Sequence, residues 1–140
     1  VAEPSADDLK VLAELRLGDA RALLHAERSS AAYYLAGYSV ECALKAIIAR
    51  SFREGVIPDR GFVQKVYSHN LTDLVGLAGL KSDLDMRMLR PAAFKTNWSL
   101  ASEWNETSRY VMVKGPRASA IVEAVGGHPE GVLAWLKEYW

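Results

Sequence analysis

The stretch from residue 31 to residue 50, AAYYLAGYSVECALKAIIAR, contains no proline and carries helix-forming and apolar side chains throughout. At 100° per residue, Tyr34, Tyr38, Glu41 and Lys45 form one narrow stripe of polar-tipped side chains. The neighbouring stripe is almost entirely apolar and consists of Tyr33, Ala36, Val40, Leu44 and Ile47. Such a helix can bury one side in a core while it presents polar groups to a cleft. The sequence therefore predicts a buried central helix around which the other segments pack.

Length and charge limit the number of domains and the kinds of partner. With 140 residues, of which 50% are hydrophobic, the chain is large enough for one domain with a real core, so we expect a single domain over residues 1–140. The 17 lysines and arginines balance the 17 aspartates and glutamates. Without an overall positive field, any contact with a polyanion such as RNA must be local.

Cysteine usage and hydropathy indicate a compartment. The single cysteine, Cys42, excludes an internal disulfide and lies in the central stretch, where a small apolar side chain is expected. No apolar run approaches the roughly 20 residues that a membrane span needs. The N-terminal residues are acidic, unlike the positively charged start of a signal peptide. We therefore expect a cytoplasmic protein with no membrane segment.

Capping residues predict where the first two helices begin. Ser5 followed by Asp8 is typical of a helix start, because the serine oxygen accepts from free amide groups and the carboxylate favours the positive helix end. The first helix should cover residues 6–27. Ser29 or Ser30 can cap the central helix, which should end near residue 52.

Turn residues and apolar spacing organise the rest of the chain. Glycine, proline and aspartate gather in residues 53–68 and predict a loop. Further helices are expected over residues 70–77, 82–101 with a kink or break at Pro91, 116–125 and from residue 129 onward. No strand pattern competes with these. The predicted fold is all-α, an antiparallel bundle of five or six helices.

The sequence lacks the residues that several kinds of functional site need. The three histidines, His25, His69 and His128, are far apart, and none lies three or four positions from another histidine or the cysteine, so we expect no metal site and no other cofactor. The glycine pair at 126–127 separates two expected helices instead of following a strand, which excludes a phosphate loop. A thiol in the middle of a helix, such as Cys42, is usually inert even where a histidine could pair with it.

A set of polar and aromatic residues remains as the candidate site. It consists of Tyr34, Tyr38, Glu41, Lys45, His69, Asn70, Trp104, Arg109 and Tyr110. Each has a structural explanation. Glu41 and Lys45 suit a helical ion pair worth about 0.3 to 0.5 kcal/mol, His69 can belong to a helix cap, and Trp104 can be a core residue with Arg109 across an aromatic ring.

Three short motifs resemble those of a known family. They are GYSVECALKA at 37–46, SHNLTDLVGL at 68–77 and WNETSRY at 104–110, and the final GVLAWLKEYW at 131–140 is similar to the end of many such chains. In this order they resemble the HEPN domain, a small helical domain linked to nucleotide binding, across nearly the whole sequence. The resemblance implies an antiparallel helical bundle, a homodimer with a cleft between protomers, and a nucleotidyltransferase partner, in some cases as toxin and antitoxin.

The resemblance also indicates which residues a catalytic HEPN protein would need. Many HEPN proteins are metal-independent ribonucleases that use an arginine, a histidine four to six residues later, and an acidic or polar residue on an earlier helix. Arg109 matches the arginine and Glu41 the acidic residue, whereas residues 114–116 are lysine, glycine and proline. The motif therefore lacks its histidine, which leaves open whether the protein is an enzyme. His69 could replace that histidine if the fold brings its ring near Arg109.

The first hypothesis is a HEPN-like nucleotide- or RNA-binding accessory protein that partners a nucleotidyltransferase in a toxin-antitoxin-like pair. In this hypothesis Arg109 and Lys45 bind a phosphate. Tyr34, Tyr38 and Trp104 stack on a base or on the surface of the partner.

Two alternatives use the same residues differently. One is a ribonuclease toxin with a rearranged active site built from Arg109, Glu41 and His69. The other is a structural dimerisation module, in which Tyr34 and Tyr38 only form an interface between two copies.

Tyr110 raises a further hypothesis. The resemblance implies that a partner enzyme can attach adenylate to a tyrosine near the arginine motif, and Tyr110 directly follows Arg109. A tyrosine at this position could equally be a core residue.

Overall fold

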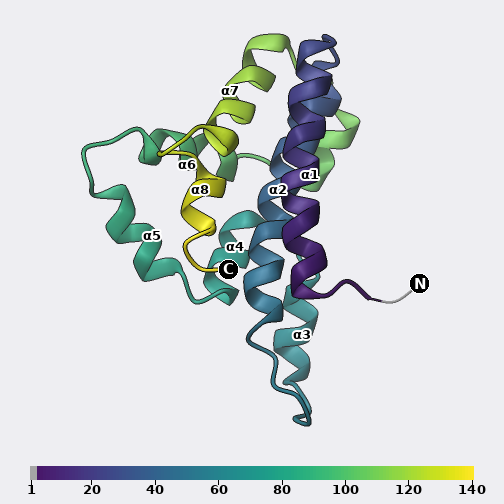
Figure 1. Cartoon of the computed structure of the whole chain (residues 1–140), viewed down its shortest axis with the longest axis vertical. Helices are drawn as coiled ribbons and strands as arrows, with labels where there is room; N and C mark the ends of the chain where they lie inside the picture. Colours follow the sequence, from purple (N-terminus) through teal and green to yellow (C-terminus); the bar gives the residue numbers. More distant parts are fainter. Residues whose placement is uncertain (1–2) are drawn as a thin grey trace.

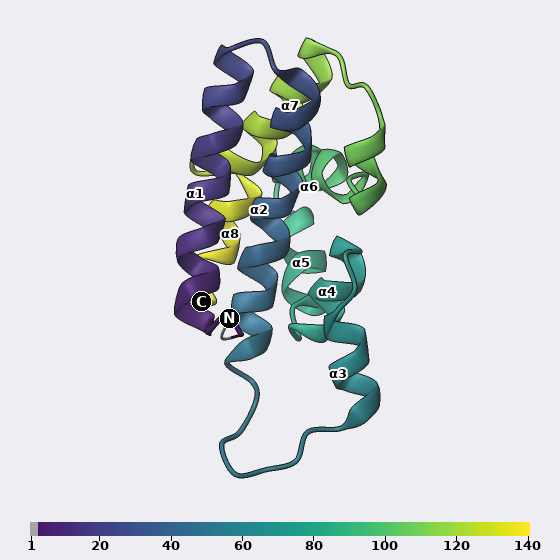
Figure 2. The same ribbon diagram turned by 90° about the vertical axis from the view of Figure 1, so that its right-hand side faces the viewer.

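Two long antiparallel helices form the spine of the protein in the computed structural model, which describes residues 3–140. They are α1, Ala6–His25, and α2, Ser29–Ala49, and they lie side by side in both views (Figures 1 and 2). Ser5 starts α1 as predicted, because its hydroxyl accepts from the Asp8 amide while the Asp8 side chain accepts from the Ser5 amide.

The central position predicted for α2 is confirmed. Of its 21 residues, 12 are buried, and they lie against α1 on one side and α7 on the other. Small residues permit a close approach of α1 and α2, since Ala13 and Ala36 are both fully buried. The Ser39 hydroxyl donates a 2.6 Å hydrogen bond to the Ala13 carbonyl oxygen, which satisfies a buried polar group between the two helices.

The other helices cover α2 and extend to both ends of the molecule. In chain order they are α3 (Arg60–Val66), α4 (Leu71–Leu77), α5 (Lys81–Met88), α6 (Phe94–Ser102), the 3₁₀ helix η1 (Glu106–Tyr110), α7 (Gly115–Gly126) and α8 (Val132–Leu136). Residues 3–140 thus contain eight α-helices and no strand. The all-α prediction is confirmed, with more helices than the five or six expected.

The predicted loop over residues 53–68 is wrong in its second half, which forms α3. The Asp59 side chain accepts from the Phe62 amide at 2.9 Å and caps this helix. Gly61 lies inside the first turn, so the concentration of glycine and proline obscured a seven-residue helix. The first half remains a loop that projects from one end of the molecule (Figure 2).

The predicted cap of the central helix is also wrong. Ser29 and Ser30 lie inside α2, and Arg28 occupies the N-cap position without a side-chain hydrogen bond to the described residues. The Ser30 hydroxyl instead accepts from the Val113 amide at 2.8 Å. This serine joins the start of α2 to the segment before α7, a long-range contact that a local pattern cannot reveal.

Later boundaries follow local signals to different degrees. Asn70 caps α4 as predicted, with its side chain accepting from the Asp73 amide at 2.9 Å. Pro116 lies in the first turn of α7. Ser82 does not cap α5, which begins one residue earlier with Leu80 at the N-cap position. The final helix begins only at Val132, three residues after the expected start.

The described part of the chain lacks two kinds of feature. Over residues 3–140, no helix is both long enough and apolar enough to cross a membrane. Within the same residues, no group of three or more histidine, cysteine, aspartate or glutamate side chains is placed to hold a metal ion.

Candidate functional site

A buried carboxylate lies at the centre of the candidate site. The side chain of Glu41 is only 5% exposed, and its two oxygens face different partners. Oε1 is 2.8 Å from Nδ1 of His69, and Oε2 is 3.5 Å from Nζ of Lys45. A buried charge is costly unless it is paired and hydrogen-bonded, so these two contacts explain how Glu41 is accommodated.

The contact with Glu41 determines which nitrogen of His69 is available. A carboxylate can only accept a hydrogen bond, so Nδ1 carries the proton in this contact and donates it. In a neutral ring Nε2 is then the nitrogen with a free lone pair. The His69 side chain is 47% exposed, so a ligand can approach this nitrogen from solvent.

The residues on either side of His69 hold it in place. The Ser68 hydroxyl accepts from the Asn70 amide at 3.0 Å, and Asn70 caps α4. Of the two residues, Asn70 and not His69 caps α4. The histidine ring is directed to Glu41, although the two residues are 28 positions apart.

Two tyrosines continue the polar stripe toward the start of α2. The rings of Tyr34 and Tyr38 are stacked with centroids 6.3 Å apart and an interplanar angle of 28°. Both side chains are partly exposed, so they offer aromatic surface to a ligand. Burial raises the pKa of Tyr38, with a further contribution from the neighbouring Cys42 thiol. The Tyr38 hydroxyl therefore stays neutral at physiological pH.

Trp104 packs against Tyr34 from the core side. Its ring centroid is 5.8 Å from that of Tyr34, but the residue is only 2% exposed. It packs on Gly37, where an added Cβ would lie 2.2 Å from the indole ring. The expectation that Trp104 stacks on a base does not fit this position, because the core covers its ring. Trp104 therefore packs behind the Tyr34 ring and does not itself contact a ligand.

Arg109 lies in η1, beside the tyrosines. Its guanidinium carbon is 5.0 Å from the ring centroid of Tyr110, a cation–π distance. Hydrogen bonding to the side chain of Tyr110, and then to that of Tyr34, raises the pKa of Arg109 above its usual value. Arg109 and Tyr110 are both exposed, so the guanidinium can meet a ligand beside Tyr34.

The structure thus brings most of the predicted residues to one face of α2. We call this surface the α2 strip, and it consists of Tyr34, Tyr38, Glu41 and Lys45 with Arg109 at one end and His69 at the other. Tyr34 and Glu41 are seven residues apart, which corresponds to about 10 Å along a helix axis. Within the chain, Arg109 and His69 therefore lie at opposite ends of the strip instead of meeting at one point.

Cys42 lies beside the strip and does not suit a nucleophile. It is 2% exposed. Burial, and then the nearby charge of Glu41, raise the pKa of its thiol to about 11. The thiol is neutral at physiological pH, which supports the interpretation of Cys42 as inert packing.

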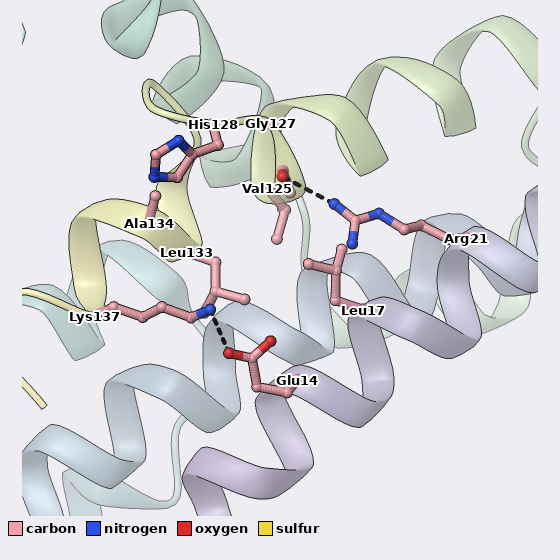
Figure 3. A pocket seen from close by; sticks show the side chains of 10 residues that line it. Glu14, Leu17, Arg21, Val125, Gly127, His128, Leu133, Ala134 and Lys137 are labelled. Atoms are coloured by element: carbon pink, nitrogen blue, oxygen red, sulfur yellow. Dashed lines mark hydrogen bonds and ion pairs between the residues drawn. The ribbon is translucent and has the colours of Figure 1, made fainter.

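A second polar group was missed by the sequence reasoning. Glu14, Arg21, His128 and Lys137 line one pocket, although they come from three separate segments (Figure 3). No motif joins them, and the glycine pair at 126–127 reads from sequence only as a helix end. Burial and spacing rules do not bring such distant positions together, so the fold alone reveals this pocket.

No protein-family model, no curated protein and no solved structure matches this chain significantly.

Proposed function

We propose that this protein is a HEPN-like nucleotide- or RNA-binding accessory protein, the partner of a nucleotidyltransferase in a toxin-antitoxin-like pair. The observation that carries the proposal is the position of Arg109, whose exposed guanidinium lies beside Tyr34 at the end of the α2 strip. A phosphate on Arg109 would place an attached base against the tyrosine pair.

The strip combines the two contacts that a nucleotide needs. Arginine binds phosphate oxygens through several N–H donors, and an aromatic face stacks on any base. Lys45 adds a second cation further along the strip, although its side chain is only 18% exposed and is paired with Glu41. We therefore assign the main phosphate contact to Arg109 and a supporting electrostatic role to Lys45.

Exposed apolar residues beside Arg109 support a protein partner. Tyr110, Val111 and Met112 are 77%, 49% and 95% exposed, and they follow one another directly. Aromatic and methionine side chains are enriched in protein interfaces. This segment suits the nucleotidyltransferase partner or the second copy in a homodimer.

Binding of labelled RNA tests the proposal. Fluorescence anisotropy with a short fluorescein-labelled single-stranded RNA would be measured for the wild type, for Arg109→Ala, and for Arg53→Ala as a control. Arg53 is also exposed but lies in the loop after α2, away from the strip. We expect Arg109→Ala to weaken binding by about tenfold or more, as for loss of a charged hydrogen-bonding partner, and Arg53→Ala to leave it unchanged. Equal losses in both variants would show non-specific charge attraction and contradict the proposal.

The hydrogen bond between Glu41 and His69 favours one alternative, a metal-independent ribonuclease. Cleavage through the ribose 2′-hydroxyl needs a group that accepts a proton near neutral pH, and His69 offers its free Nε2. Glu41 would orient the ring, and Arg109 would stabilise charge on the phosphate, either along the strip or from the second protomer.

Cleavage assays in EDTA distinguish this alternative from binding alone. RNA cleavage that is lost in both Arg109→Ala and His69→Ala would establish the ribonuclease and replace the binding-only proposal. If the strip serves only as a dimer interface, calorimetry with nucleotides shows no affinity, and Tyr34→Ala or Tyr38→Ala dissociates the dimer in sedimentation experiments.

A further inference from the structure

A second polar pocket lies on the molecule outside the α2 strip. It is a cavity of about 300 Å³ between α1, the segment that joins α7 to α8, and α8 (Figure 3). Its charged and titratable side chains are Glu14, Arg21, His128 and Lys137. No residue of the strip lines it, so an inference about this pocket is independent of the proposed function.

The guanidinium of Arg21 is held in a defined position at one side of the pocket. Its Nη2 donates a 2.9 Å hydrogen bond to the Gly126 carbonyl oxygen, across 105 positions of sequence. Gly126 makes this approach sterically possible, because an added Cβ would lie 2.5 Å from the same nitrogen. A guanidinium has five N–H donors, so donors remain for a ligand in a group that is already oriented.

Lys137 lies on the other side of the pocket and forms an ion pair with Glu14, as Figure 3 shows. The side chains of this pair are 41% and 50% exposed, so both remain accessible to solvent. His128 lies at the rim above Lys137 (Figure 3). The pocket holds two permanent cations and one carboxylate, and the imidazole adds a third positive charge when it is protonated. The electrostatic environment is therefore positive.

The remaining wall of the pocket is apolar. Leu17 and Leu133 line it with exposed fractions of only 4% and 2%, and Val125 is fully buried. Ligand sites typically combine an apolar lining with a few fixed polar groups, and their volumes begin at about 300 Å³. The volume of the pocket lies at the small end of this range.

We propose that this pocket binds a small organic oxyanion, with its phosphate or carboxylate head between Arg21 and Lys137. The head would take the donors of Arg21 that Gly126 leaves free and would compete with Glu14 for Lys137.

Titration of the ¹⁵N-labelled protein with phenyl phosphate and, separately, with benzoate tests the proposal by NMR. We expect saturable shifts of the Gly126 and Gly127 amides, with Kd values of about a millimolar, typical of a small exposed charged site. Saturation by phenyl phosphate only assigns a phosphate head, and saturation by benzoate only assigns a carboxylate head. The absence of saturable shifts at these amides up to about 10 mM of both probes would overturn the proposal.

Variants that remove single charges test whether the pocket residues are responsible for the binding. Arg21→Gln should weaken binding by about fivefold or more. The matched control is Arg16→Gln, also on α1, where the guanidinium is paired with Asp19 and does not line the pocket. Glu14→Gln should tighten binding by about threefold, because it removes the one carboxylate among the described residues that line the pocket and releases Lys137.

The tightening expected for Glu14→Gln separates binding from a structural role. If Glu14 and Lys137 form only a structural ion pair, Glu14→Gln should lower the stability of the protein without tightening a saturable anion site. Equal effects of Arg21→Gln and Arg16→Gln, or weaker binding by Glu14→Gln, would contradict the proposal. Circular dichroism spectra of each variant would establish that it is folded.

Discussion

The ring of His69 and the carboxylate of Glu41 form a 2.8 Å hydrogen bond between two different helical segments. The buried end of the contact lies in the middle of α2, and the exposed end lies just before α4. This relationship joins a buried carboxylate of α2 to a side chain that solvent can reach. It also makes the stability of the protein sensitive to a residue on its surface.

Removal of the histidine ring should destabilise the fold. In His69→Ala, Oε1 of Glu41 loses its donor while it stays buried, and an unsatisfied buried acceptor costs about 1–3 kcal/mol. Urea unfolding followed by circular dichroism would measure the free energy of unfolding. Tyr67→Ala is the matched control, since Tyr67 is 71% exposed and lies two residues earlier, and we expect it to change stability by less than about 0.5 kcal/mol. Equal effects in both variants would mean that the Glu41 contact is not responsible.

Gly37 should not tolerate a methyl group. The Cβ of Gly37→Ala would lie 2.2 Å from the Trp104 ring, so the indole or α2 must shift, at a cost of about 1–3 kcal/mol for overpacking. Gly18→Ala is the matched control within α1, where an added Cβ meets no described atom within 4 Å. That variant should stabilise the protein by up to about 1 kcal/mol through helix propensity. Thermal unfolding of both variants checks these opposite signs, and stabilisation of both would show that Trp104 moves freely.

The Cys42 thiol should be unreactive in the folded protein. Its pKa is raised to about 11, so only about one thiol in a thousand is ionised at pH 8, and only the thiolate attacks disulfide reagents. We expect Ellman's reagent to react slowly with native protein at pH 8 and rapidly after addition of guanidinium chloride. Rapid reaction of the native protein would indicate that α2 opens locally.

Stability should depend on acid pH partly through Asp8. Hydrogen bonds from the Ser5 amide, and then from its hydroxyl, hold the pKa of Asp8 below its ordinary value of 3.8. The unfolded chain therefore takes up this proton first as the pH falls, so the contribution to stability is present above pH 3.8 and is lost as the pH falls through the lower folded pKa. Melting temperatures of the wild type and Asp8→Asn should differ at pH 7 and converge as the pH approaches 3. A constant difference across this range would contradict the assignment.

Tyr110 is the expected acceptor if the partner nucleotidyltransferase modifies this protein. Its side chain is 77% exposed and lies beside Arg109, which could hold the phosphates of ATP during transfer. Under the proposed pairing, intact mass spectrometry after incubation with the partner and ATP should show one added adenylate on the wild type and none on Tyr110→Phe. Tyr67→Phe, which removes another exposed hydroxyl, should still be modified. Modification of Tyr110→Phe would exclude this acceptor.

Local sequence patterns predicted a large part of the secondary structure. The capping box at Ser5, the Asn70 cap and the proline in the first turn of α7 depend on residues within about four positions of each other. The stripe on α2 was predictable for the same reason, since helical spacing alone places Tyr34 and Glu41 on one face. These features require no knowledge of how the helices pack.

Other features depend on contacts between distant segments, and only the tertiary structure decided them. Burial of Trp104 against Gly37 converts an expected ligand surface into a support, and the pocket at Arg21 exists because α1 meets the end of α7. The pairing of His69 with Glu41 belongs to the same class. Helical periodicity specifies the face of the helix on which a side chain lies. Which residue that side chain contacts depends on how the whole chain packs, because the partners that satisfy a buried polar group can lie far away in sequence.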